Sequence, residues 1–308
     1  MVGMDWGVHL PHLGRQATRR NVIEFAQHVE QLGFHSGWVS DHIAWPRSIE
    51  SKYPYSDDGS FAPAIDMPWL DPIGTLFFVA GCTERLQLGS TVLILGYRPP
   101  VLTAKAIASL DALSEGRVIL GVGVGWMREE FEVLGMPYDQ RGRRADEQLE
   151  LFRTFFAEPT SSYHGEFYDV PEVGFAPKPV HGSVPIWVGG DSEPAFRRVA
   201  RFGDAFHAAF QDVDAVASGW RRVRELATEL GRDHSTIRLS VRMYLDPASS
   251  MPASKSIAGS TDQMVDTVGS WSAIGVDHIL LDPVAPGGID GRRAALESFM
   301  LDVAPQIT

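Results

Sequence analysis

The chain has 308 residues, 44% of them hydrophobic, and a formal net charge of −12 at pH 7. The length permits two domains, but a single α/β barrel also reaches this size, and no linker or low-complexity tract divides the sequence. The negative charge argues against nucleic acid and anionic membranes as partners, because both favour a basic surface.

The cysteine content and the hydropathy of the sequence indicate the cellular compartment in which the protein is expected. The sequence has one cysteine, Cys82, which rules out an internal disulfide and fits a reducing environment. No signal peptide and no apolar run of membrane-spanning length is recognisable. We therefore expect a soluble cytoplasmic protein in which residues 1–308 form a single domain.

Strand and helix patterns alternate along the chain. Apolar runs predict eight strands, at residues 7–10, 34–40, 86–94, 118–122, 186–188, 205–207, 237–245 and 276–281. Apolar residues at helical spacing predict helices around residues 22–32, 77–80, 99–113, 149–156, 196–200, 216–226, 265–271 and 292–300. Eight strand–helix units are typical of an α/β fold with a closed, TIM-like (β/α)8 barrel. An open doubly wound sheet is the alternative, because counting elements does not distinguish it from a barrel.

Two long insertions interrupt this alternation, one after the second strand and one before the fifth. Residues 43–70 are polar and rich in proline and aromatic side chains, and residues 157–184 contain several prolines. Long loops in compact domains are usually functional or interface elements. We predict that residues 43–70 form a lid over the catalytic face of the barrel.

Two glycine-containing turns follow predicted strands, at residues 121–126 and 189–192. Glycine lets a ligand approach the backbone closely, and two such turns at strand ends predict one site for a large, partly anionic cofactor. The first turn is not the dinucleotide motif G-x-G-x-x-G, because its third glycine comes one residue too early. The alternative is that each turn only reverses the chain.

The ends of barrel strands converge on one face, where catalytic residues are found. His42 is the best acid–base candidate there, because imidazole exchanges protons near neutral pH. Asp41 precedes it at the end of the second strand, and a structural Asp-His pair is the alternative interpretation. The same face receives Ser90 to Val92, both glycine turns, His207, Arg242 to Tyr244 and Asp282.

Other chemistries have weaker support. His9 and His12 are three residues apart, which on a strand places them on opposite faces unless the chain turns, and no metal-ligand spacing is present. We therefore predict no metal site. The basic run from Arg141 to Arg144 is followed by Asp146 and Glu147, so we interpret it as a solvated helix start with internal ion pairs.

Several segments together resemble the bacterial luciferase-like flavin oxidoreductases. They are Leu88-Gly89-Ser90-Thr91-Val92-Leu93, Tyr97-Arg98-Pro99-Pro100, Ala104-Lys105, residues 110–117 and residues 120–126. Further segments resemble the branch that uses the deazaflavin coenzyme F420, namely Gly125-Trp126, Glu130-Phe131, Gly135-Met136-Pro137 and Arg141-Gly142-Arg143-Arg144. With matches at residues 185–190, 197–198, 203–204 and 275–278, the resemblance covers nearly the whole chain.

This resemblance implies a TIM-like barrel that binds a flavin or deazaflavin at its C-terminal face. Asp41 and His42 would lie beside the ring, with His42 as the proton donor, and Thr91-Val92 would form the family's non-proline cis peptide behind it. Gly123 would line the ring, and the turn of Gly189, Gly190, Asp191 and Ser192 would hold the phosphate. Asp191 departs from the pattern, because a neutral side chain suits a phosphate better than a carboxylate.

We therefore predict an F420-dependent oxidoreductase that transfers a hydride between the cofactor and a small organic substrate. Trp45 and Trp126 are the predicted substrate contacts. One alternative is an FMN-dependent luciferase-like monooxygenase, and another is a non-catalytic flavin- or deazaflavin-binding protein. The family resemblance also implies a homodimer, and we expect no nucleic-acid or membrane partner.

Overall fold

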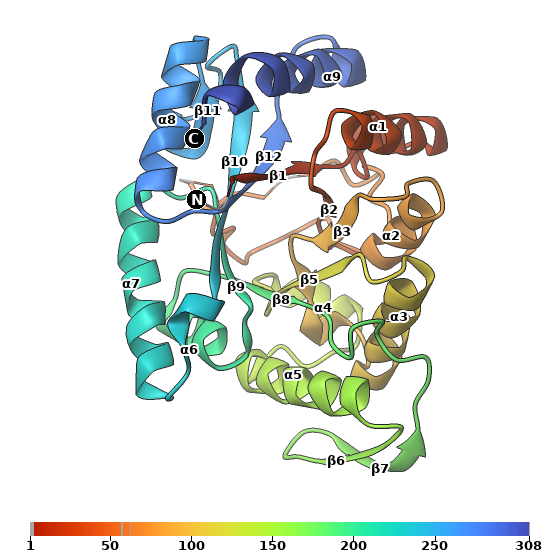
Figure 1. Cartoon of the computed structure of the whole chain (residues 1–308). Helices are drawn as coiled ribbons and strands as arrows, with labels where there is room; N and C mark the ends of the chain where they lie inside the picture. Colours follow the sequence, from red (N-terminus) through yellow and green to blue (C-terminus); the bar gives the residue numbers. More distant parts are fainter. Residues whose placement is uncertain (1–2, 57, 62, 308) are drawn as a thin grey trace.

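The computed structural model describes residues 3–56, 58–61 and 63–307, and its strands form a closed parallel barrel (Figure 1). The ring runs through β1 (Asp5–His9), β2 (Ser36–Val39), β3 (Gln87–Ser90), β5 (Val118–Gly123), β8 (Ile186–Gly189), β9 (Ala205–Ala209), β10 (Arg238–Asp246) and β12 (His278–Pro283). It closes because β12 pairs with β1 and β9 pairs with β10. The closed ring confirms the predicted (β/α)8 barrel and excludes the open doubly wound sheet.

Each predicted strand is present, but the third is split. Residues 86–94 form β3 and a separate short strand, β4 (Leu93–Ile94), which pairs with β5. Between them the Thr91–Val92 peptide bond is cis. The backbone therefore leaves the strand direction where it reaches the C-terminal end of the barrel.

Helices surround the barrel on the outside, as Figure 1 shows. They are α1 (Arg19–Gln31), α2 (Pro72–Ala80), α3 (Pro100–Leu113), α4 (Arg128–Val133), α5 (Arg141–Ala157), α6 (Glu193–Phe202), α7 (Val213–Glu229), α8 (Thr261–Ala273) and α9 (Gly288–Ser298). Capping residues set several starts: Thr18 accepts from the Asn21 amide before α1, and Ser260 with Gln263 forms a capping box before α8. Helix α4 was not predicted, because six residues are too short to show helical periodicity.

The two insertions differ in structure. No helix or strand is assigned within the described part of residues 43–70, apart from an isolated bridge between Leu13 and Trp69. The second insertion, residues 157–184, contains an antiparallel hairpin of β6 (Thr160–His164) and β7 (Asp169–Gly174). A short strand that was also not predicted, β11 (Ser256–Ala258), extends the sheet beside β10.

Large aromatic side chains fill the barrel interior, and strand glycines make room for them. Trp38 and Trp187 form a buried cluster there. A Cβ on Gly89 would lie 2.3 Å from the Trp38 ring, and a Cβ on Gly121 would lie 1.8 Å from the Ser90 carbonyl oxygen. Gly121 therefore belongs to strand packing inside β5, and not to a cofactor turn as its sequence context predicted.

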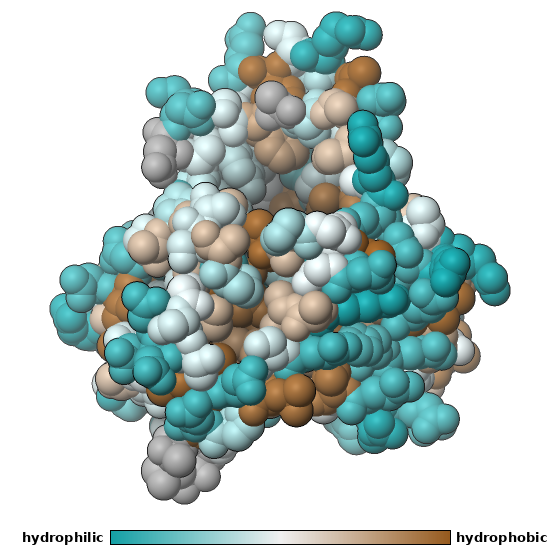
Figure 2. All heavy atoms as spheres, turned by 90° about the horizontal axis from the view of Figure 1, so that it is seen from above, coloured by the Kyte–Doolittle hydropathy of each residue, from teal (hydrophilic) through white to brown (hydrophobic). Residues whose placement is uncertain are grey.

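The outer surface gives no sign of a membrane-spanning segment. In the described part of the chain no helix is both long and apolar enough to cross a bilayer. On the face drawn in Figure 2, apolar residues form separate areas among hydrophilic ones.

Candidate active site

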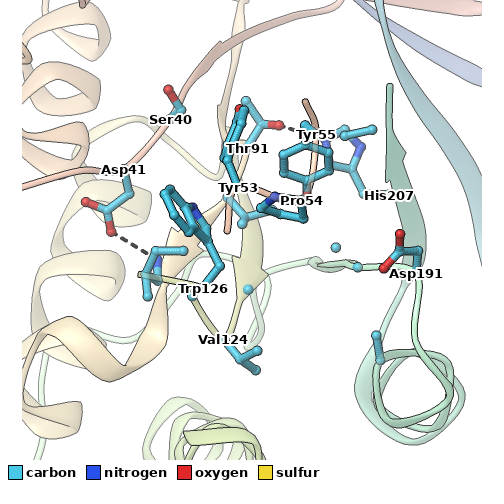
Figure 3. Close-up of a pocket in the computed structure, with 18 of the residues that line it drawn as sticks. Ser40, Asp41, Tyr53, Pro54, Tyr55, Thr91, Val124, Trp126, Asp191 and His207 are labelled. Carbon is cyan, nitrogen blue, oxygen red and sulfur yellow. Dashed lines mark hydrogen bonds between the residues drawn. The ribbon is translucent and has the colours of Figure 1, made fainter. Parts of the chain in front are cut away.

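A cavity of about 600 Å³ opens at the C-terminal ends of the strands. Figure 3 shows side chains from several strand ends around it, with Asp41 and Asp191 on opposite sides. Of the residues predicted for the site, Asp41, His42, Thr91, Val92, Gly123, Trp126, Gly189, Gly190, Asp191 and Ser192 line this cavity. Trp45 does not line it. The fold thus brings together residues that are up to 151 positions apart, from Asp41 to Ser192.

His42 contacts a carboxylate that sequence analysis did not assign to the site. Its Nδ1 lies 2.6 Å from Oε2 of Glu130, the third residue of α4. Because a carboxylate accepts hydrogen bonds, Nδ1 carries a proton in this pair. Nε2 is then the ring nitrogen of His42 that remains for a bound substrate.

Glu130 is buried and receives several hydrogen bonds. Its Oε1 accepts from the backbone amides of Ile43 at 2.6 Å and Ala44 at 3.1 Å, and its Oε2 accepts from the Tyr97 hydroxyl at 2.8 Å. Burial raises the pKa of Glu130, but the hydrogen bond and charge of His42, together with these donors, outweigh burial and lower it. Glu130 is therefore a buried carboxylate that fixes the orientation of His42.

Aromatic side chains surround the His42 ring on the cavity side. The ring centroid of His42 lies 5.0 Å from that of Phe61, 4.8 Å from that of Trp69 and 6.2 Å from that of Trp126. Trp45 lies 6.3 Å from His42 and 5.8 Å from Trp69, outside the cavity lining. Trp45 therefore supports the aromatic wall and does not form part of its surface.

Asp41 is held by Arg98, which lies two residues before the start of α3. Arg98 donates to both carboxylate oxygens of Asp41, at 2.6 and 3.0 Å, and the Ile94 amide donates to one of them at 3.0 Å. Arg98 also donates to Asp71, the N-cap of α2, at 2.8 Å. Asp41 is thus buried as one half of a bidentate ion pair that joins β2, β4 and α3.

Two glycines make room for the Val92 side chain beside the cis peptide. A Cβ on Gly123 would lie 2.5 Å from Cγ2 of Val92, and a Cβ on Gly189 would lie 3.0 Å from Cγ1 of the same residue. A side chain at either position would crowd Val92. The Thr91–Val92 peptide is cis, as the resemblance implied, and both of its residues line the cavity.

One end of the cavity is suited to an anionic group. Residues in the first turns of α5 and α6 line it, and the Ser192 side chain caps no backbone amide of α6. Free amides and the helix dipole make such helix starts favourable for anions. Arg198, which is buried, contributes a positive charge there, balanced by Asp146 at 2.6 Å.

The basic run at the start of α5 differs from its predicted role. Arg141 is not a solvated residue: it lines the cavity, donates to the Gly125 carbonyl at 2.9 Å and stacks on Tyr138. Arg143 is exposed and pairs with Glu166 of the second insertion, and Asp146 pairs with Arg198 of α6, so the predicted ion pairs within the helix start are not those that form. Sequence periodicity does not show that Arg141 faces the cavity and Arg143 faces solvent, because both residues lie in the first turn of α5.

The β10 and β12 ends contribute an ion pair at the cavity wall. Arg242 donates to Asp282 at 2.5 Å and lies over the Phe210 ring. Burial raises the pKa of Asp282, but His9, Arg242 and Arg292 together lower it strongly. Nε of Arg242 is buried and has no hydrogen-bond partner in the described part of the chain.

His9 and His12 lie side by side, in contrast to strictly alternating strand residues. Their ring centroids are 4.9 Å apart, because β1 ends at His9 and the chain turns before His12. Nε2 of His12 accepts from the Ser40 amide at 3.0 Å, and its Nδ1 contacts the Leu10 carbonyl at 3.1 Å. Among the described residues, no three metal-ligating side chains gather into a site.

Comparison with known proteins identifies the family of this chain. A family model described as luciferase-like monooxygenase matches residues 4–277. The chain belongs to this family. Its known members include flavin- and F420-dependent oxidoreductases.

Individual relatives extend the comparison. An uncharacterised protein of Mycobacterium tuberculosis is 37% identical over 210 residues, which cover 68% of this chain and 72% of the relative. The F420-dependent glucose-6-phosphate dehydrogenase of Amycolatopsis mediterranei is 30% identical over 191 residues, 61% of this chain and 52% of that enzyme. A solved F420-dependent secondary alcohol dehydrogenase, in complex with an F420–acetone adduct, covers 99% of both chains with a TM-score of 0.81 at 16% identity, which shows a shared fold.

The residues present fit a flavin or deazaflavin. Gly123 and Gly189 line the cavity beside Val92 and add no side chain to it, which suits a flat ring. The helix starts of α5 and α6 offer backbone amides for a phosphate. The unpartnered Nε of Arg242 is a buried donor beside the same cavity.

Proposed function

We propose that this protein is an F420-dependent oxidoreductase acting on a small organic substrate. The observation that carries the proposal is the His42–Glu130 pair, which faces a cavity whose glycines and helix starts fit a ring and a phosphate. The similarity to an F420-dependent glucose-6-phosphate dehydrogenase supports F420 over FMN. A bound deazaflavin supplies a carbon that accepts or donates a hydride.

Within this proposal, the chain's own residues handle the proton and exclude water. Nε2 of His42 donates a proton to the substrate oxygen, or removes one from it, as charge develops there. Glu130 keeps the imidazole in the required tautomer and orientation. The aromatic wall of Phe61, Trp69 and Trp126 binds the carbon part of the substrate and keeps solvent away.

The proposed substrate class is an alcohol and its carbonyl counterpart. A single imidazole in an apolar wall suits a neutral oxygen that gains or loses one proton. Two relatives favour the same class, a secondary alcohol dehydrogenase of the same fold and a mycobacterial ketoreductase that is 33% identical over 225 residues. Neither of these two similar proteins identifies a particular alcohol as the substrate of this protein.

The first test is equilibrium binding of oxidised F420 and of FMN to the purified protein, measured side by side by fluorescence quenching. Tight F420 binding with weak FMN binding is the expected result. The reverse preference would contradict the proposed cofactor, and binding of neither would contradict the cofactor assignment as a whole.

An FMN-dependent monooxygenase is the second candidate, favoured by the description of the family model. It predicts oxygen consumption when reduced FMN is supplied without an organic substrate. Because free reduced FMN is oxidised by oxygen on its own, each trace is compared with a protein-free control. A rate of oxygen consumption that the protein changes favours the monooxygenase, and a rate equal to the control favours the F420-dependent dehydrogenase.

We also propose a homodimer formed by the face of α2 and α3. Leu102 on α3 is 64% exposed and Phe78 on α2 is 40% exposed, and the two helices are neighbours on one side of the barrel (Figure 1). Light scattering is expected to give twice the chain mass of 33.9 kDa. The Leu102→Lys variant is expected to shift that mass toward the single-chain value, and an unchanged mass would exclude this face.

A further inference from the structure

A continuous series of buried hydrogen bonds crosses the barrel interior beneath the cavity. Its members lie on β2, β12, β10 and β9 and end between β3 and β4. The proposed acid–base step at His42 uses none of them. In order, they are Trp38, Ser36, His278, Ser240, His207 and Thr91.

The contacts are short and all the members are buried. Trp38 Nε1 lies 2.8 Å from Ser36 Oγ, which lies 3.0 Å from His278 Nε2. Ser240 Oγ lies 2.8 Å from Nδ1 of His278 and 2.8 Å from Nδ1 of His207. His207 Nε2 then lies 3.0 Å from Thr91 Oγ1.

Trp38 sets the direction of this series. An indole N–H only donates, so Ser36 Oγ accepts from Trp38. Among the described residues, the only other partner of the Ser36 hydroxyl is Nε2 of His278, which must therefore accept the hydroxyl hydrogen. A neutral His278 then carries its proton on Nδ1 and donates to Ser240.

The hydrogen bonds keep this direction from Ser240 as far as Thr91. Ser240 accepts from His278, and its own hydrogen has one remaining partner in the described structure, Nδ1 of His207. His207 then carries its proton on Nε2 and donates to Thr91 Oγ1. In the opposite direction the Ser36 hydrogen would be buried against the Trp38 N–H with no acceptor, which is unfavourable.

Both histidines are neutral, as the argument requires. Burial lowers the pKa of His207 to about 3, with a smaller contribution from the charge of Arg242. Burial also lowers the pKa of His278 well below its usual value. Each ring therefore has one N–H donor and one acceptor nitrogen near neutral pH.

We infer that Thr91 presents its hydroxyl hydrogen to the cavity and donates it to an acceptor atom of the bound ligand. Thr91 lines the cavity, and His207 is the only described partner of its Oγ1. The matching ligand class carries a carbonyl oxygen or an unprotonated ring nitrogen at this place. The inference rests on the proposed function for its ligand, since flavin and deazaflavin rings carry such acceptors, but the direction of the series does not depend on it.

The first experiment determines the tautomers in the ligand-free protein. Two-bond proton–nitrogen correlation spectra of protein with 15N-labelled histidine distinguish the Nδ1–H and Nε2–H forms, and single His207→Gln and His278→Gln variants assign the signals. We expect Nδ1–H for His278 and Nε2–H for His207. The opposite tautomers, or protonation of either ring at pH 7.5, would overturn the inference.

The second experiment measures the hydrogen bond from Thr91. Thr91→Val removes the hydroxyl with little change in shape, and Thr91→Ser restores it. Loss of one hydrogen bond is expected to raise the dissociation constant for oxidised F420 about three- to tenfold in Thr91→Val, and Thr91→Ser should recover most of the affinity. Equal affinity of Thr91→Val and the wild type would overturn the inference.

The two experiments separate the inference from the proposed function. If the wild type binds neither F420 nor FMN, the proposed function is wrong, whereas the histidine spectra still decide the direction in which Thr91 points. If the wild type binds F420 and the spectra show the opposite tautomers, the proposed function stands and the role of Thr91 is wrong.

Discussion

The proton on Nδ1 of His42 is held by Glu130, so the two residues act as one unit. The carboxylate is buried and also accepts from the Tyr97 hydroxyl and from the backbone amides of Ile43 and Ala44. A partly satisfied carboxylate at this depth would be costly, whereas this one is saturated with donors. The pair therefore links the position of the imidazole to the position of residues 43–44.

The first prediction at this scale concerns His42. His42→Ala is expected to lower kcat/KM for an alcohol or ketone substrate about 10²- to 10⁴-fold, the usual range for loss of an acid–base group. F420 binding should be unchanged, because the phosphate end of the cavity is untouched. Unchanged turnover with intact cofactor binding would show that His42 is structural, as a non-catalytic binding protein requires.

The second prediction concerns the carboxylate. Glu130→Gln keeps the shape but removes the charge that orients His42, and is expected to lower kcat about 10- to 100-fold with a smaller change in KM. Glu132→Gln is the matched control, because Glu132 is exposed on the same helix. A loss confined to thermal stability, with kcat unchanged, would contradict the positioning role.

Hydrogen bonds from α4 attach the first part of the insertion, residues 43–51, to the rest of the protein. Glu129 and Glu130, both in the first turn of α4, accept backbone amides from residues 43–51. Oε1 of Glu129 accepts from Glu50 at 2.7 Å and from Ser51 at 3.0 Å. The Ser51 hydroxyl in turn accepts from the Arg128 amide at 3.1 Å. A short helix that sequence patterns did not show therefore anchors the longest irregular segment.

We propose that residues 43–70 act as a lid held by this contact. Glu129→Ala is expected to speed hydrogen exchange at the amides of Glu50 and Ser51 at least several-fold, because their acceptor is lost. Exchange in the barrel strands should not change. Glu132→Ala, on the same helix, serves as the control, and equal exchange in both variants would show that the carboxylate does not hold the lid.

Buried neutral histidines give the whole molecule a predictable response to acid. Burial lowers the pKa of His12 to about 4 and that of His207 to about 3, from a usual value of 6.5. Below pH 6.5 the unfolded chain binds protons that the folded protein does not, so stability is highest above 6.5 and falls as pH decreases. Each histidine contributes roughly 1.4 kcal/mol per pH unit in this range.

The matching measurement is urea denaturation between pH 7.5 and 4.5. From pH 6.5 to 4.5 the two histidines together should remove roughly 4 kcal/mol of unfolding free energy. His207→Gln should reduce this slope, because one of the buried protonation sites disappears. A free energy of unfolding that stays constant down to pH 5 would contradict the assignment of these rings as neutral and buried.

Much of the fold and part of the site were predictable from local patterns. His42 and Gly189 follow apolar strand patterns, Thr91 is indicated by the family resemblance, and all three line the cavity. Glu130 was not selected, since 88 residues separate it from His42 and nothing near it in sequence indicates the contact. Trp45 was selected from its place in an aromatic loop, but composition does not show which aromatic rings face a cavity.

The sequence by itself determined the alternation of strands and helices and the glycine turns that follow two of the strands. These features depend on residues close together in the chain, where the periods of strand and helix are visible. Only the tertiary structure decided that Glu130 reaches His42, that Arg141 turns inward, and that a donor at Trp38 sets the direction of hydrogen bonds as far as Thr91. Such contacts depend on barrel closure and strand register, which no short segment of the chain specifies alone.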